Sequence, residues 1–468
     1  MVNVDRHRAR AGERPRRTGT SVRTLLALGG AATLLALSAC GATGSGGDPA
    51  TGTIQWWTWD DKQAVSWGKC VEPFEQANPG IEVEVQQYAW DDYWTKLTAG
   101  FVAGDAPDTF MNHTSNYPEF VDQGQLLPLD DLIEESGYDV GRLGVGVDTW
   151  RYSDGLTYGL PKDWATVGFF YDKGKVADAG LTEDDVANMT WNPDDGGTFE
   201  KVVARLTVDE NGVRGDEPGF DPDHVATYGI NSLGSNGING QDTWANFAST
   251  TGWTLGDKDS FPTTFRYADE RFVKTARYLR GLGERGLSPV EGQFTLGPAE
   301  QLGTGSVAMV SGGSWYATTF FGLDGVDVGI APSVRGDDGE RAGMSNSNAD
   351  SIWAGTEHPE AAFKWVAYMN SPECQDVAGA DGTFFPSIDS SMEKTAASLL
   401  DQGIDIAPYT EQLVDGTLFE TPVFAGGQEM GSAISPLMEA YFTGQREDDV
   451  FAEMDALSKE ILAQQSPR

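Results

Sequence analysis

The sequence has few of the residues that build metal sites. Its 468 residues include three cysteines and four histidines, which are scattered and form no Cys-x-x-Cys pair. A zinc centre needs several such ligands at short spacing, so we expect no metal and no cofactor. Basic residues are also scarce, because 32 Lys and Arg stand against 71 Asp and Glu and leave a net charge of −39. A surface of that sign repels nucleic acid and anionic lipid, and it excludes nucleic acid as a partner.

Long apolar runs are almost absent. The one candidate, from Leu25 to Leu37, is too short for a membrane span and follows a region with seven arginines. It ends in Leu37-Ser38-Ala39-Cys40, which is similar to a bacterial lipobox. Residues 1–39 therefore predict a lipoprotein signal peptide that is removed before a lipidated, palmitate-bearing Cys40. The alternative is a buried leucine-rich helix with a stray cysteine, and the export route, Sec or twin-arginine, stays open.

After Cys40, the segment 40–51 is rich in glycine and predicts a flexible tether that joins a membrane anchor to the fold. Only Cys70 and Cys374 remain beyond it. In an oxidising compartment these two cysteines either pair as a disulfide or stay apart as buried thiols, and the sequence leaves both outcomes open.

Helical and strand patterns alternate along the rest of the chain, as is typical of α/β proteins. Three strands at 53–58, 81–88 and 109–112, with helices at 63–77 and 93–102 between them, predict parallel strands with both faces covered. Further patterns predict strands at 306–316 and 327–334, a helix that begins at Pro359 and a last amphipathic helix around 450–461. The region 190–260 predicts long loops with short helices.

Several segments, in this order, resemble the family 1 extracellular solute-binding proteins of ATP-driven sugar importers, the group that includes maltose-binding protein. The segments are TIQWWTWDDK (53–62), FEQANPGIEVEVQQYAWDDYWTKLTAGFVAGDAPDTFMN (74–112), GQLLPLDDLI (124–133), YGLPKDWATVGFFYDKGKVADAGL (158–181), SVAMVSGGSWY (306–316) and HPEAAFKWVAYMNSPECQDVAGADGTFFPS (358–387). Residues 190–260 match no part of the family pattern. The resemblance implies a two-lobed periplasmic-binding-protein-like fold of type II, with a hinge that the chain crosses more than once. It places the N-terminal lobe at 52–161 and 350–412, the C-terminal lobe at 164–342 and 418–468, and the crossings at 162–164 and 343–349.

The resemblance also implies a function without catalysis. A protein of this family captures its ligand by closure of the two lobes and delivers it to the transmembrane subunits of an ABC permease. We expect a monomer, anchored at Cys40 on the outer face of the bacterial cytoplasmic membrane, that binds a neutral sugar or oligosaccharide. A sugar ring favours flat aromatic surface, and its hydroxyl groups need amide or carboxylate partners at the edge.

Tryptophans supply the predicted aromatic surfaces. Trp56 and Trp57 alternate within a strand and are interpreted as core, whereas Trp59 lies beyond the strand end and is a predicted ligand contact. Trp315 follows two glycines, where the family often stacks a sugar; a core tryptophan is the alternative. Trp244 and Trp253, in the region without a family match, are a predicted second platform.

Polar residues near the strand ends and crossings supply the predicted edge contacts. Asp61 follows Trp59 and matches the family's acidic residue there; Asn112 ends the third strand; Asp163 lies at the first crossing; Asn346 and Asn348 lie at the second. The alternatives are a surface turn for Asp61, a helix cap after Asn112 and a hinge hydrogen bond for Asp163.

Three rival functions remain. The first is the same fold with a polyamine, a peptide or a glycerol-phosphate-type cargo. The second is a secreted glycoside hydrolase that uses Asp61 and Asp163, which would have to stand at a set separation about the scissile bond. The third is a lipid-anchored adhesin with no transport partner.

Overall fold

The computed structural model describes residues 50–465. The predicted signal peptide, the lipidation of Cys40 and most of the predicted tether lie outside these residues. Between residues 50 and 465, no helix combines the length and the apolar character that crossing a membrane requires.

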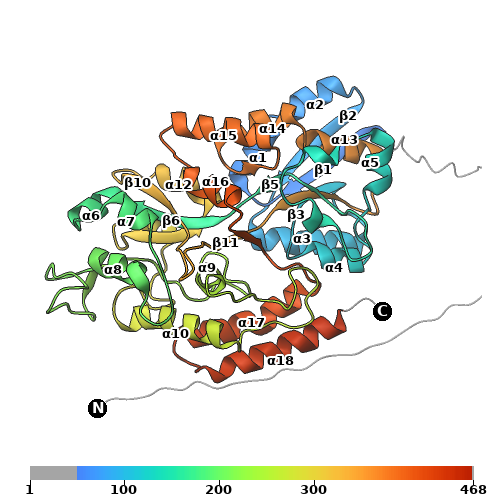
Figure 1. The fold of residues 1–468 in the computed structure, drawn as a ribbon. Helices are drawn as coiled ribbons and strands as arrows, with labels where there is room; N and C mark the ends of the chain where they lie inside the picture. Colours follow the sequence, from blue (N-terminus) through green and yellow to red (C-terminus); the bar gives the residue numbers. More distant parts are fainter. Residues whose placement is uncertain (1–49, 466–468) are drawn as a thin grey trace, which may run out of the picture. The chain divides into compact units, whose positions relative to one another are not determined.

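The first sheet joins five strands in the order β2-β1-β3-β12-β4 (Figure 1). They are β1 (Gly52–Thr58), β2 (Ile81–Gln87), β3 (Thr109–His113), β4 (Leu160–Pro161) and β12 (Asn348–Ile352). Strand β1 pairs in parallel with β2 and β3, whereas β12 runs antiparallel between β3 and β4. The predicted parallel beginning is confirmed, and a strand from late in the sequence completes the sheet.

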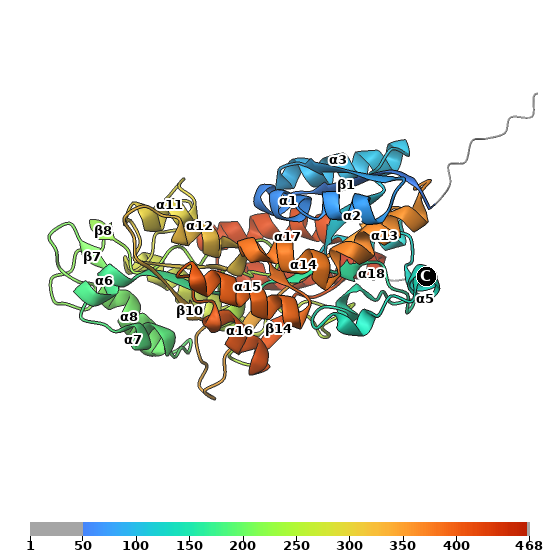
Figure 2. The same cartoon turned by 90° about the horizontal axis from the view of Figure 1, so that it is seen from above.

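Helices cover both faces of this sheet, as Figures 1 and 2 show. One face carries α1 (Asp61–Gly68), α2 (Val71–Ala77), α5 (Asp130–Ser136), α13 (Pro359–Met369) and α14 (Pro372–Ala378), and the other carries α3 (Trp90–Ala103) and α4 (Tyr117–Asp122). Trp56 packs with the first group and Trp57 with the second, because successive strand residues point to opposite faces. Both tryptophans are buried, as predicted.

The second sheet has three antiparallel strands in the order β10-β6-β9. They are β6 (Val167–Asp172), β9 (Met309–Gly313) and β10 (Val328–Pro332). One face packs on α8 (Gly197–Leu206), α9 (Trp244–Ser249), α10 (Glu270–Glu284), α17 (Gly427–Phe442) and α18 (Asp449–Gln464). The other packs on α12 (Ala317–Phe321), α15 (Asp389–Asp401) and α16 (Ala407–Val414). Residues 389–412, which the sequence assigned to the first lobe, thus share a hydrophobic cluster with the second sheet.

The region 190–260 contains two short helices, α8 and α9, and the short strands β7 (Val208–Asp209) and β8 (Val225–Thr227), joined by loops. This agrees with the pattern predicted for it. Three further short helices surround the second sheet: α6 (Lys173–Asp178), α7 (Glu183–Ala187) and α11 (Pro298–Gly303).

Two small sheets form where the chain passes between the main sheets. Strand β5 (Asp163–Trp164) pairs with β13 (Phe385–Pro386), and β11 (Gly343–Ser345) pairs with β14 (Leu418–Glu420). The chain therefore passes from one main sheet to the other along short strands, and each of these strands is held by hydrogen bonds to a neighbouring strand.

A disulfide and a buried ion pair hold the first sheet's helices and strands together. Cys70 and Cys374 form a disulfide between residues 304 positions apart, which settles the alternative that the sequence left open. Lys162 is fully buried and lies 3.2 Å from Asp350, which also accepts a 2.7 Å hydrogen bond from Nε1 of Trp56. A buried ammonium without such a partner would cost several kcal/mol, so the burial of Lys162 depends on its contact with Asp350.

Candidate functional site

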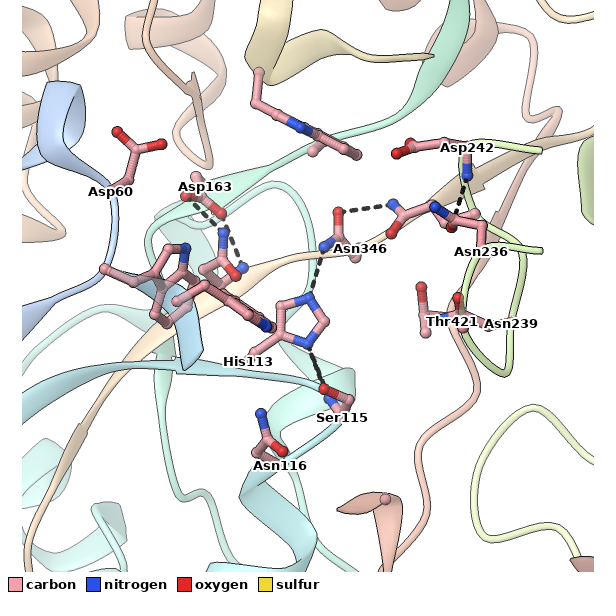
Figure 3. Close-up of a pocket in the computed structure, with 18 of the residues that line it drawn as sticks. Asp60, His113, Ser115, Asn116, Asp163, Asn236, Asn239, Asp242, Asn346 and Thr421 are labelled. Carbon is pink, nitrogen blue, oxygen red and sulfur yellow. Dashed lines mark hydrogen bonds between the residues drawn. The ribbon is translucent and has the colours of Figure 1, made fainter. Parts of the chain in front are cut away.

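A cavity of about 780 Å³ lies at the edge where β1 and β3 end and β12 begins, and it also borders the ends of β5 and β9 (Figure 3). Open α/β sheets place ligands beyond the carboxyl ends of their strands, so this position is the one expected for binding. Its side chains come from both main sheets and from the loop 236–242. The polar and aromatic members are Trp59, Asp60, Gln63, Trp90, His113, Ser115, Asn116, Asp163, Trp164, Asn236, Asn239, Gln241, Asp242, Ser314, Trp315, Tyr316, Asn346, Asn348, Phe384, Phe385, Thr421, Phe424, Gln428 and Ser435.

Trp59 reaches the cavity from the end of β1. Its ring is half-buried and packs against Trp90, Tyr93 and Trp94, with ring centroids 5.1 to 5.3 Å apart. Three aromatic neighbours fix the orientation of the indole, and Trp90 is itself 44% exposed. The end of the first strand thus presents a rigid aromatic surface to the cavity, as the sequence predicted for Trp59.

The acid next to Trp59 that lines the cavity is Asp60, which corrects the prediction of Asp61. Asp60 caps helix α1 by accepting a 2.8 Å hydrogen bond from the backbone N–H of Gln63. Burial, with a contribution from neighbouring Asp61, raises the pKa of Asp60. Asp61 is exposed at the start of the helix and does not line the cavity.

The end of β3 also contributes a different residue from the one predicted. Asn112 is fully buried, donates a hydrogen bond to Ser351 and does not line the cavity. Strand β3 continues through His113, so the residue that reaches the cavity is His113. The prediction of Asn112 as a ligand contact is therefore corrected, because the strand is one residue longer than its pattern indicated and successive residues alternate between faces.

His113, Asn346 and Gln241 form a chain of hydrogen bonds across the cavity wall (Figure 3). Burial lowers the pKa of His113 to about 4, so its ring is neutral near pH 7. Nε2 of His113 lies 3.0 Å from Nδ2 of Asn346, and Oδ1 of Asn346 accepts from Nε2 of Gln241 at 3.2 Å. The other ring nitrogen lies 2.8 Å from Oγ of Ser115. This chain connects the end of β3 to the loop 236–242 through the segment between β11 and β12.

Asp163 and Asn348 form a second polar pair in the cavity wall. The carboxylate accepts hydrogen bonds from the backbone N–H of Asn348 at 2.8 Å and from its Nδ2 at 3.1 Å. Burial raises the pKa of Asp163 to about 6, against the opposing effect of Lys162 and of these two bonds. Oδ1 of Asn348 is buried and has no hydrogen-bond partner. The predicted residues Asp163, Asn346 and Asn348 all line the cavity.

Trp315 faces the cavity from the end of β9. Its side chain is half-buried, and it follows Gly312 and Gly313 at the point where the strand passes into a short 3-10 helix. A Cβ atom added to Gly313 would stand 2.1 Å from the ring of Trp315, so the indole lies directly on the glycine backbone. The position of Trp315 thus depends on Gly313.

Trp244 and Trp253 lie in the hydrophobic core of the second sheet's helices, which corrects their prediction as a second platform. They are 0% and 1% exposed, and their rings pack on each other and on Phe272. Nε1 of Trp253 donates to the backbone carbonyl of Arg266. Helix α10 and the helices near the C-terminus bury both indoles, and local sequence carries no signal of that distant packing.

The loop 236–242 supplies further cavity residues that the sequence did not indicate. Asn236, Gln241 and Asp242 line the cavity, and the backbone N–H of Asp242 donates to Asn236. Burial raises the pKa of Asp242 to about 7. No lysine or arginine stands among the described residues of the cavity wall. In the same part of the chain, residues 50–465, no group of three or more His, Cys, Asp or Glu side chains is arranged to hold a metal ion.

Sequence comparisons identify the family. The family of bacterial extracellular solute-binding proteins matches residues 69–398 of this chain. The chain is 26% identical over 147 residues to the lactose-binding protein of Rhizobium radiobacter, a match that covers 30% of this chain and 34% of that protein. The chain spans roughly a quarter to a third of the length of the curated relatives that it matches.

Solved structures share the fold over most of the chain. One is the ABC substrate-binding protein Lmo0181 from Listeria monocytogenes in complex with cycloalternan, at 18% identity and a TM-score of 0.75, covering 88% of this chain and 99% of that one. Another is the sugar-binding protein MalE from Xanthomonas citri, at 23% identity and a TM-score of 0.68, covering 88% and 98%. At this level of identity the likeness concerns the fold, which is the two-lobed fold of periplasmic binding proteins.

Proposed function

The chain belongs to the bacterial extracellular solute-binding proteins, and from this membership we propose that it captures a neutral sugar or oligosaccharide and delivers it to the membrane subunits of an ABC importer. The observation that carries the proposal is the pairing of two half-buried indoles, Trp59 and Trp315, in one cavity with an amide- and carboxylate-lined wall. The C–H faces of a sugar ring pack on indoles, and its hydroxyl groups donate to oxygen acceptors.

The charge of the cavity argues against an anionic cargo. Asp60, Asp163 and Asp242 line it, and the described wall contains no lysine or arginine. A phosphate or sulfate group in such a cavity would meet carboxylates without a balancing cation, which costs free energy at low dielectric. The charge of the cavity therefore favours a neutral sugar over a glycerol-phosphate-type cargo. A polyamine satisfies the charge but makes little use of two indoles.

The mode of capture follows from the origin of the walls. Trp59, His113 and Asn348 extend from the first sheet, Trp315 and Tyr316 from the second, and Asn346 from the segment between them. A ligand that touches all three gains contacts only when the two lobes approach, so it shifts the population toward the closed form. We place the crossings at 162–164 and 343–349, and we propose a monomer that binds without chemical turnover.

The membrane attachment belongs to the same proposal. Its support is the order of basic region, short apolar run and Leu-Ser-Ala-Cys at 37–40. Such a chain would be held by lipid at Cys40 on the outer face of the membrane, beside its permease. A mass spectrum of the mature protein extracted from membranes tests this: a diacylglyceryl-modified Cys40 at the N-terminus is expected, and an unmodified N-terminus upstream of Cys40 would contradict it.

A thermal-shift screen across mono- and oligosaccharides tests the central claim. A ligand at about 100 times its Kd adds about 2.7 kcal/mol to the stability of the form that it binds, so it raises Tm measurably. At least one sugar should raise Tm and be recovered intact after incubation. Stabilisation by spermidine, a peptide or glycerol phosphate with none by any sugar would overturn the sugar assignment, and release of hydrolysis products would favour the glycoside hydrolase.

A further inference from the structure

A second, smaller cavity opens beside the main one. It has a volume of about 220 Å³ and shares Asn236, Asp242 and Tyr316 with the main cavity. We call it the side chamber. Its remaining walls come from the segments 231–235 and 289–294, from helix α11 and from Ser311 of β9. One water molecule needs a cavity of about 10–15 Å³ on this measure, so the side chamber is large enough to accept a substituent of the ligand.

Three residues that line the side chamber each have a buried polar side-chain atom with no hydrogen-bond partner. Oδ1 of Asp242, Oε1 of Gln301 and Oγ1 of Thr243 are all buried without a hydrogen-bond partner. The amide nitrogen of Gln301 already donates to the carbonyl of Leu296 at 2.8 Å, so its free atom is an acceptor. Thr243 is only 6% exposed. Buried polar atoms in native proteins are nearly always paired, and carboxylate and amide oxygens can only accept, so the atoms of Asp242 and Gln301 indicate a missing hydrogen-bond donor.

The side chamber also carries negative charge without a cation. Asp242 and Glu291 line it, and its described wall holds no lysine, arginine or histidine. Glu291 accepts hydrogen bonds from Ser232 at 2.7 Å and Ser235 at 2.9 Å, which hold its carboxylate in place. Asp242 has no such support on Oδ1, and its burial raises its pKa to about 7.

We propose that the side chamber receives a protonated amino group, so that the cargo is a saccharide in which an amine replaces one hydroxyl. An ammonium group brings three donors and no acceptor. Its positive charge would also balance the negative charge of Asp242. A hydroxyl group supplies one donor and leaves the buried charge unbalanced. This inference rests on the proposed capture of a sugar and narrows it, because the ring still packs on the indoles while the substituent enters the side chamber.

The test compares matched sugars. Isothermal titration at pH 7.5 would measure glucose, galactose, mannose and cellobiose against their 2-amino-2-deoxy counterparts, with the N-acetylated sugars as neutral controls of similar bulk. The buffer contains 0.5 M NaCl, which screens attraction to the acidic surface but not a buried contact. At least one amino sugar should bind about ten- to hundredfold more tightly than its hydroxyl and N-acetyl partners, as expected for a buried charge-assisted hydrogen bond.

Variants assign the preference to the side chamber. Asp242→Asn keeps the shape and removes the charge, and it should abolish the preference for the amino sugar over its hydroxyl partner. Glu291→Gln should reduce the preference by a smaller factor, since that carboxylate already has two serine partners. Asp324→Asn removes one charge from an exposed site outside both cavities and should leave the preference intact.

The outcomes separate the two levels of the proposal. If hydroxyl and amino sugars bind equally, or if the preference survives in Asp242→Asn, the side-chamber assignment falls and the sugar-binding function stands. If no sugar binds in either form, the proposed function itself falls and takes the side-chamber assignment with it. Binding of spermidine without any sugar would have the same meaning.

Discussion

The indole of Trp315 rests on Gly313 so closely that a Cβ atom at Gly313 would overlap ring carbons at 2.1 to 2.3 Å. The neighbouring Gly312 is different, because its Cβ would meet Phe170 and Tyr316 at 3.7 Å, an ordinary contact distance. The two adjacent glycines therefore have separate roles: the first can carry a methyl group, and the second provides the surface on which the cavity's tryptophan lies.

This difference predicts the effect of Gly313→Ala. The added methyl group should push the indole aside and weaken sugar binding by about 1–3 kcal/mol, close to the loss expected for Trp315→Ala, since both remove the same aromatic surface. Gly312→Ala is the matched control and should bind almost normally. Titration calorimetry measures the affinity, and circular dichroism checks that each variant folds. Equal losses in the two alanine variants would argue against a role for Trp315.

Truncation of Trp244 should mainly lower the stability of the fold, whereas truncation of Trp59 should mainly weaken sugar binding. Trp244 is fully buried among Trp253, Tyr267 and Phe272, so Trp244→Ala should lower the free energy of unfolding by about 3–5 kcal/mol. Trp59→Ala should cost less stability, because its ring is half-buried, and should weaken sugar binding instead. Urea denaturation and calorimetry on both variants separate the effects. A selective loss of binding in Trp244→Ala would restore it as a ligand contact.

Glu420 predicts a pH dependence of stability. Its Oε2 is buried without a partner, and burial raises its pKa from 4.5 to about 7. Because the folded-state pKa lies above the unfolded-state value, this group favours folding fully below about pH 4.5 and loses that contribution as the pH rises through 7. Glu420→Gln should therefore raise the free energy of unfolding at pH 8 by about 1–3 kcal/mol and change little at pH 4.5.

The control for this prediction is Glu393→Gln on the exposed face of α15. It removes one carboxylate without burial and should leave the pH profile parallel to that of the native protein. Thermal unfolding monitored from pH 4.5 to pH 8 gives both profiles. A gain of the same size at every pH in Glu420→Gln would show that titration of Glu420 is not the cause.

Reduction of the Cys70–Cys374 disulfide should destabilise the protein. The bond closes a loop between residues 304 positions apart, and loss of such a constraint from the unfolded chain typically costs about 2–5 kcal/mol. Tm should fall in dithiothreitol and in Cys70→Ala/Cys374→Ala, whereas sugar affinity at low temperature should be unchanged, since neither cysteine lines the cavity. An unchanged Tm under full reduction would contradict the prediction.

The strands of the first sheet could be predicted because their signals are local. The alternation in Ile81–Gln87 and the apolar residues of β1 identify strands without reference to the rest of the chain. The two errors at their ends have different causes. Strand β3 runs one residue further than its pattern indicated, so His113 reaches the cavity instead of Asn112. Strand β1 ends at Thr58 as predicted, but helix α1 begins at Asp61, and its N-cap Asp60 lines the cavity.

The loop 236–242 could not be predicted because its role depends on distant packing. Its position is set by Gln241, which bonds to Asn346 and to Asn246, residues that come together only in the complete fold. The same holds for Trp244 and Trp253, because these indoles lie in a polar segment and are buried by packing on Phe272 of α10. Composition indicated an acidic protein, but it did not show that a carboxylate without a partner lies at the side chamber.

The position of β12 has a consequence for folding. Residues 348–352 insert between β3 and β4, so the first sheet lacks a central member until almost three quarters of the chain has been made. A polypeptide of this topology cannot complete its amino-terminal half first. The edges of β3 and β4 stay unpaired until that late strand arrives, and until then they are open to pairing with other strands.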